Sequence, residues 1–168
     1  MPPRRLTRTA DAPASRDPQA ARLAAVTLLS RRDYAVRELS ERLVQRGFEE
    51  AAAARVVVEL LREGALDDAR YAQNYVTYHA GRGQGPLRIA AELRRSGLAA
   101  DLIDAALAAG PDWTALARKV CRAKFGLQPP DSWTERARRA RFLQYRGFSS
   151  DHIRAATGVE PDTGFSEP

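Results

Sequence analysis

Apolar residues recur along this chain at spacings of three and four, which places them on one face of a helix. Val36, Leu39 and Leu43 are one such set, and comparable sets continue from about residue 19 to residue 157. No segment in this range shows the two-residue alternation of a half-buried strand. The pattern predicts an all-α protein.

Three landmarks repeat along the chain at a fixed distance. Gly47, Gly97 and Gly147 are fifty residues apart, and each is followed by Phe or Leu. A period of this size is typical of tandem helical repeats that stack on their neighbours. Each glycine has the position of a helix C-terminal stop, where the left-handed conformation is cheapest for glycine. We predict that these glycines end the second helix of each repeat.

The period divides the chain into three repeats of three helices each, at residues 19–66, 67–112 and 113–157. Residues 1–18 are rich in Pro, Ala, Ser, Thr and Arg and have no apolar period, so we expect a disordered basic tail. Residues 158–168 resemble a short, flexible acidic tail.

The second repeat begins with two carboxylates and contains the chain's densest glycine cluster. Asp67 and Asp68 can cap a helix and stabilise its dipole. A metal or acid–base pair is the alternative, but no His lies at helical spacing from them. The later Gly85-Pro86 predicts a tight turn with proline at the first position of the next helix. A phosphate loop is disfavoured because a helix, not a strand, precedes it.

A tyrosine stripe lies on the first helix of this repeat. Tyr71, Tyr75, Tyr78 and Arg82 follow one another at steps of four, three and four, so they share one face. Tyrosine suits half-buried positions where its hydroxyl remains wet. We therefore favour a wall between neighbouring repeats over a platform for stacking bases.

Charge is basic overall, and its distribution is one-sided. The chain has 27 Lys and Arg against 21 Asp and Glu, a net charge of +6. Arginine dominates this count, which codon bias can explain, so the distribution is more informative than the total. Arg88 and Glu92 form an expected pair, which leaves Arg94 and Arg95 in excess. In the third repeat five arginines, from Arg136 to Arg146, oppose one glutamate. This imbalance favours a binding surface over a merely solvated face.

The sequence lacks the residues that a disulfide, a zinc site, the common catalytic motifs or a membrane span would require. Cys121 cannot form an internal disulfide, so we expect a reducing cytosol and a small buried hydrophobe at this position. His79 and His152 lie far apart without ligand spacing, so zinc is not expected. No nucleophile elbow or kinase loop occurs, and no apolar run approaches the ~20 residues of a membrane span. We predict a cytoplasmic protein without enzyme activity, cofactor or membrane contact.

The central stretch resembles a known family. Its motif residues are similar to the central signature of RecX, the bacterial regulator of the RecA recombinase. These residues are Asp67-Asp68, Arg70-Tyr71-Ala72, Tyr75, Arg82, Gly85-Pro86, Arg88-Ile89 and Glu92-Leu93. Gly47-Phe48 and Arg146-Gly147-Phe148 resemble the first and third repeats of the same family. The resemblance covers about residues 20–157.

The resemblance implies an elongated, curved array of three tandem three-helix repeats of about 50 residues each, expected to be monomeric. Such proteins bind the RecA–DNA filament and inhibit ATP hydrolysis, strand exchange and co-protease function, thereby modulating recombination, DNA repair and the SOS response. Contact with DNA itself is expected to be weak or through the filament. The alternative is a direct DNA-binding helical module, because three-helix units resemble helix-turn-helix domains.

Two groups of residues carry these expectations. The expected filament- or DNA-binding residues are Arg70, Tyr71, Arg82, Arg88, Arg94, Arg95, Arg136, Arg138, Arg139, Arg141 and Arg146. The expected structural residues are Gly47, Asp67, Asp68, Gly85, Pro86, Gly97 and Gly147.

Overall fold

The computed structural model describes residues 14–158, and this range forms nine α-helices. Residues 1–13 and 159–168, which make up most of the two predicted tails, lie outside the described residues. The described end of the N-terminal tail is hydrogen-bonded. The amide of Ser15 donates to the Gly47 carbonyl at 2.7 Å, and its carbonyl accepts from the Glu49 amide at 3.0 Å. Asp17 then caps the first helix, which begins at Pro18.

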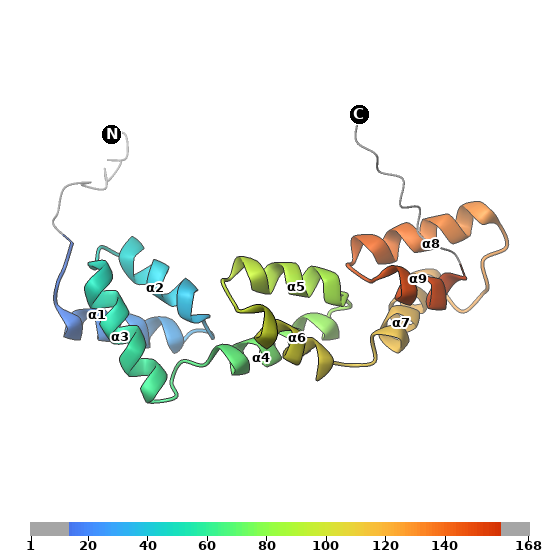
Figure 1. Ribbon diagram of the computed structural model, residues 1–168. Helices are drawn as coiled ribbons and strands as arrows, with labels where there is room; N and C mark the ends of the chain where they lie inside the picture. Colours follow the sequence, from blue (N-terminus) through green and yellow to red (C-terminus); the bar gives the residue numbers. More distant parts are fainter. Residues whose placement is uncertain (1–13, 159–168) are drawn as a thin grey trace, which may run out of the picture. The chain divides into compact units, whose positions relative to one another are not determined.

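The chain divides into two compact units, and the first ends at Leu66. This unit holds one repeat, made of α1 (Pro18–Leu29), α2 (Val36–Gln45) and α3 (Glu50–Arg62) (Figure 1). Its three apolar faces meet in one core. The fully buried members of that core are Ala21, Ala25, Leu39, Leu43, Ala53 and Val56.

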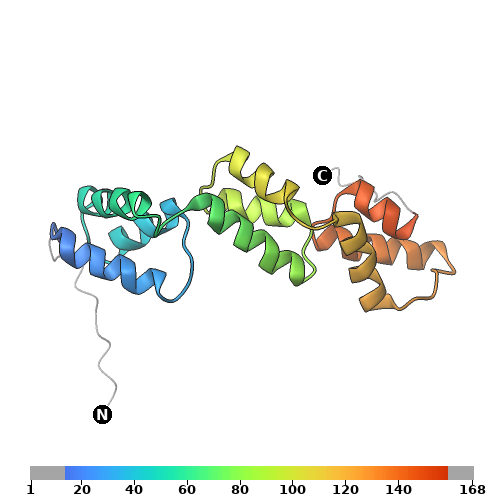
Figure 2. The same ribbon diagram turned by 90° about the horizontal axis from the view of Figure 1, so that it is seen from below.

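The second unit begins at Asp67 and holds two repeats in tandem. In order, its helices are α4 (Asp68–Gly81), α5 (Pro86–Arg95), α6 (Ala100–Ala108), α7 (Trp113–Phe125), α8 (Trp133–Tyr145) and α9 (Ser150–Thr157) (Figure 2). Within each repeat the first and third helices pack together, α4 on α6 and α7 on α9. The predicted all-α architecture of three tandem three-helix repeats is confirmed.

The same stop ends the second helix of every repeat. Gly47, Gly97 and Gly147 have φ angles of 94°, 87° and 88°, in the left-handed region that favours glycine. The amide after each glycine donates back to the buried leucine of the preceding turn. These bonds join Phe48 to Leu43 at 3.2 Å, Leu98 to Leu93 at 3.3 Å and Phe148 to Leu143 at 3.1 Å. The pattern is a Schellman motif, so the predicted stops are confirmed.

The predicted helix starts of the second repeat are also confirmed. The Asp67 carboxylate accepts from the amides of Ala69 and Arg70 at 2.9 and 3.0 Å, and Asp68 lies in the first turn of α4. Gly85 is the N-cap residue of α5, and Pro86 follows at the first helical position.

Candidate interaction surface

Repeats two and three meet at two glycines. The Gly85 amide donates to the Arg146 carbonyl at 2.8 Å, and the Leu87 amide donates to the Gly147 carbonyl at 3.0 Å. A Cβ atom at Gly85 would lie 2.3 Å from the Gly147 oxygen, and one at Gly147 would lie 2.3 Å from the Cβ of Arg88. Only glycine permits this approach at either position. The turn before α5 is therefore also the contact with the next repeat.

A polar cluster joins the first two helices of the second repeat. The Tyr75 hydroxyl donates to Glu92 Oε2 at 2.7 Å, and Arg88 Nε donates to Glu92 Oε1 at 3.2 Å. Burial alone would raise the pKa of the Glu92 carboxyl, but the hydrogen bonds from Tyr75 and Arg88 outweigh it and lower that pKa. Burial is also the main reason that the pKa of Tyr75 is raised.

The tyrosine stripe includes one residue that bridges two helices of its own repeat. Tyr71 is buried, Tyr75 stacks on His79 with ring centroids 4.0 Å apart, and Tyr78 is exposed. Through the bond to Glu92, Tyr75 joins α4 to α5. Tyr71 was expected on the binding surface, and its burial is a correction to that expectation.

Arg139 requires a second correction, since its side chain is only 10% exposed. Its Nη1 donates to the Gln128 carbonyl at 3.0 Å, and its Nε donates to Glu135 at 3.2 Å. The side chain thus fastens the connection between α7 and α8 to the start of α8. A charge count along the helix could not separate this arginine from its exposed neighbours.

Three more of the expected binding arginines contribute to structure. Arg146 Nη1 donates to the Arg82 carbonyl at 3.1 Å, across the junction of the repeats. Arg82 Nη1 in turn donates to the Tyr78 hydroxyl at 2.9 Å. Arg88 holds Glu92 and packs over Gly147. These side chains hold the second unit together as well as carrying charge.

The remaining expected arginines are exposed, and they lie at three places in the second unit. Arg70 is in the first turn of α4, while Arg94 and Arg95 are in the last turn of α5. Arg138 is 69% exposed at its side chain and lies 3.5 Å from Glu135. Arg136 and Arg141 complete the set on α8.

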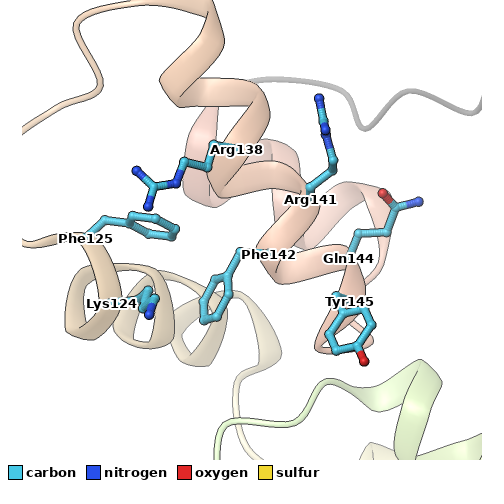
Figure 3. Close-up of a pocket in the computed structure, with 7 residues that line it drawn as sticks. All are labelled: Lys124, Phe125, Arg138, Arg141, Phe142, Gln144 and Tyr145. Atoms are coloured by element: carbon cyan, nitrogen blue, oxygen red, sulfur yellow. The ribbon is translucent and has the colours of Figure 1, made fainter.

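Two hollows mark the third repeat and its junction with the second. The aromatic hollow, of about 570 Å³, is lined by Lys124, Phe125, Arg138, Arg141, Phe142, Gln144 and Tyr145 (Figure 3). The junction hollow, of about 390 Å³, shares Lys124 and Phe142 with it and adds the cations Arg82, Lys119 and Arg146. None of the described residues that line either hollow is Asp or Glu.

Sequence reasoning missed half of this surface. Lys119, Lys124, Phe125, Phe142 and Tyr145 were not among the expected binding residues. One signal was available: the chain's two lysines both lie in α7, beside the arginine-rich α8. Of the expected binding arginines, Arg82 and Arg146 line the junction hollow, while Arg94 and Arg95 line neither hollow.

No group of three or more His, Cys, Asp or Glu residues within residues 14–158 could hold a metal ion. No helix in the same range is long and apolar enough to cross a bilayer. Cys121 is buried, as predicted for a small core residue, and burial raises the pKa of its thiol.

The tandem three-helix units define an all-α helical-repeat protein. Three family models match the chain in order: the first three-helix domain of RecX at residues 21–60, the second at 67–107 and the third at 112–157. The chain belongs to the RecX family, as the sequence signature suggested.

Similar proteins support this assignment. A regulatory protein RecX from Halorhodospira halophila is 45% identical over 142 residues, which cover 84% of this chain and 88% of that protein. The regulatory protein RecX of Xanthomonas axonopodis pv. citri is 46% identical, over 79% of this chain and 83% of its own. A crystal structure of RecX from Lactobacillus salivarius shares the fold, with a TM-score of 0.73 at 20% identity, over 83% of this chain and 93% of that one.

Proposed function

We propose that this protein binds the RecA–DNA filament and inhibits RecA activities, namely ATP hydrolysis, strand exchange and co-protease function. In this way it would modulate recombination, DNA repair and the SOS response. The kinship with proteins named regulatory protein RecX, over 84% of the chain, carries the proposal. The RecA partner would supply the ATPase chemistry, and this chain would act in the cytoplasm as a monomer.

The exposed arginines provide a physical basis for filament binding. A guanidinium group offers a planar fork of N–H donors that suits both carboxylates and phosphates. Arg94 and Arg95 are exposed at the end of α5, and Arg136 and Arg141 are exposed on α8. Such groups could contact RecA protomers and approach the DNA phosphates of the same filament.

The test is the DNA-dependent ATPase rate of RecA from the same organism. Stoichiometric amounts of the wild-type protein should lower that rate. Arg94→Glu with Arg95→Glu should raise the concentration for half-inhibition by about tenfold or more, because it reverses two exposed charges. The matched control is Arg55→Glu with Arg62→Glu, two exposed arginines of α3 outside the expected binding set. An unchanged ATPase rate with the wild-type protein would contradict the proposal.

Direct DNA binding is the second candidate function, favoured by the acid-free basic lining of the two hollows. It predicts tight binding to DNA without RecA, and affinity that falls steeply with salt as counterions are released. Arg88 is a poor residue for testing either function. Its reversal would break the bond to Glu92 and place two carboxylates side by side next to Tyr75.

A further inference from the structure

The aromatic hollow has an apolar floor and a basic rim. The Phe125 and Phe142 rings meet edge to face, with centroids 5.3 Å apart and planes at 88°. Tyr145, which is 83% exposed, stands beside them from the last turn of α8. Figure 3 shows Arg138 beside the Phe125 ring and Lys124 on α7, while Arg141 and Gln144 point away from the rings.

The second repeat has no aromatic floor at the equivalent positions. Fifty residues before Phe142 stands Glu92 of α5, which accepts the 2.7 Å hydrogen bond from Tyr75 of α4. The buried Ala117 and Cys121 of α7 match Ala72 and Val76 of α4, so the counterpart of Phe125 is Ala80. In repeat two a carboxylate therefore lies between the first and second helices and neutralises part of the arginine charge. In repeat three an apolar ring takes its place, and no Asp or Glu is among the residues that line the hollow, although Arg138 lies 3.5 Å from Glu135 outside it.

We propose that the aromatic hollow binds an acidic peptide segment of a partner protein that carries a bulky apolar anchor residue. The anchor would enter between Phe125, Phe142 and Tyr145 and lose its contact with water. Carboxylates on either side of the anchor would pair with Lys124, Arg138 and Arg141. An acidic segment fits because the rim supplies three cations and no lining acid.

The ring faces argue for a peptide anchor over nucleic acid bases. Bases of a single strand stack on free aromatic faces. Here the guanidinium carbons of Arg138 and Arg139 lie 5.5 and 5.4 Å from the Phe125 centroid. Arg146 lies 5.2 Å from the centroid of Phe142. Arginine thus lies near both phenylalanine rings, which themselves meet edge to face, whereas an aliphatic or aromatic side chain can still fill the hollow.

The assay uses the full chain and a short fluorescein-labelled acidic peptide with Trp and Leu one helical turn apart, followed by fluorescence anisotropy. Its comparison probes are the same peptide with both anchors replaced by Ala, and a labelled oligothymidylate of equal length. We expect the anchored peptide to bind about tenfold more tightly than the Ala peptide, because the anchor supplies the central buried contact.

Two variants test the hollow itself, each with a matched control. Tyr145→Ala removes an exposed wall, and Trp133→Ala removes an exposed aromatic residue at the other end of α8. Lys124→Glu reverses a rim charge, and Arg122→Glu reverses an exposed charge in the same turn of α7 that lines neither hollow. We expect each hollow variant to weaken peptide binding about fivefold or more, and each control to change it by less than about twofold.

Three outcomes would overturn the proposal. The first is equal affinity for the anchored and Ala peptides, and the second is an equal loss in a variant and its control. The third is tighter binding of oligothymidylate that is lost on Tyr145→Ala, which would make the hollow a nucleic acid groove. The proposal does not rest on RecA regulation. The peptide assay contains no RecA, so a failure here is distinguishable from a failure in the ATPase assay.

Discussion

Repeats two and three share one backbone plan, yet they differ at the contact between their first and second helices. In repeat two this contact is the Tyr75–Glu92 hydrogen bond, supported by Arg88. In repeat three it is the Phe125–Phe142 ring contact, with Arg138 over Phe125 where Arg88 stood beside Glu92. Glu92 and Phe142 are at equivalent positions of the second helix, so a carboxylate in repeat two is replaced by an aromatic ring in repeat three. The face closed by a polar cluster in repeat two is an apolar hollow with a basic rim in repeat three.

The difference shows that two repeats with the same framework can carry different surfaces. Leu93 and Leu143 are both fully buried, and both Schellman stops are formed, so the framework is the same. The residues at equivalent surface positions are then free to differ. The close contact between the repeats joins Gly85 of repeat two to Gly147 of repeat three. Arginine serves both roles, as a structural donor at Arg139 and as an exposed cation at Arg141.

The largest effect is expected at the glycine contact between the repeats. Gly147→Ala should lower the free energy of unfolding of the second unit by about 3 kcal/mol, because left-handed strain adds to a Cβ collision with Arg88. Gly47→Ala is the control, since it has the same strained φ but open space around its Cβ, and it should cost about 1 kcal/mol. Urea unfolding followed by circular dichroism measures both. Equal costs would mean that the contact does not constrain Gly147.

The polar cluster of repeat two should have the next largest effect. Tyr75→Phe removes the donor to the half-buried Glu92 carboxylate and should lower the free energy of unfolding by about 1.5 kcal/mol. Phe125→Tyr adds a hydroxyl to the first helix of repeat three, where Phe142 offers no carboxylate to accept its hydrogen bond, and it should not stabilise the chain. If Phe125→Tyr stabilised the protein as much as Tyr75→Phe destabilised it, the contrast between the repeats would be wrong.

A smaller, pH-dependent effect is expected in repeat three alone. His152 Nδ1 accepts from the Ser149 amide at 3.3 Å and completes the capping box of α9, a role that needs the neutral imidazole. Burial lowers the pKa of His152 despite the opposing charges of Asp151 and Asp112. The unfolded chain thus binds the proton more readily.

The stabilisation by His152 is therefore complete above its ordinary pKa of 6.5 and is lost as the pH falls through the lower folded value. We expect a loss of about 1 kcal/mol, the usual size of a cap contribution. His152→Gln keeps a capping-box acceptor without the titration, so urea unfolding should show a weaker pH dependence between pH 7 and pH 5. An unaltered pH dependence in this variant would contradict the assignment. Repeat two has Leu102 at the equivalent position and no titrating group there.

The smallest effect on stability is expected for Arg94→Glu with Arg95→Glu. Both side chains are exposed, so the free energy of unfolding, measured by thermal denaturation, should change by no more than about 0.5 kcal/mol. The proposed inhibition of RecA should weaken in the same variant. A large loss of stability would show that these arginines hold the fold, as Arg139 does.

Periodicity made most of the fold predictable. The three stops, the Asp67 cap and Pro86 follow from local chain chemistry, because glycine, aspartate and proline each suit one backbone position. The candidate interaction surface could be predicted less well from the sequence. Whether an arginine is buried, as Arg139 is, depends on a carbonyl eleven residues away that no helical period reveals. The aromatic hollow requires two helices to be placed side by side, so the sequence alone offered no reason to single out Phe125 and Phe142.

The most direct test of the central claim is a comparison of two affinities at one salt concentration. Labelled protein is titrated with preformed RecA filaments on single-stranded DNA, and separately with the same DNA alone. RecA regulation predicts clearly tighter binding to the filament, and a preference that shrinks in Arg94→Glu with Arg95→Glu but not in Arg55→Glu with Arg62→Glu. Equal affinity for filament and bare DNA, with the steep salt dependence of phosphate binding in both, would contradict it and identify a DNA-binding module.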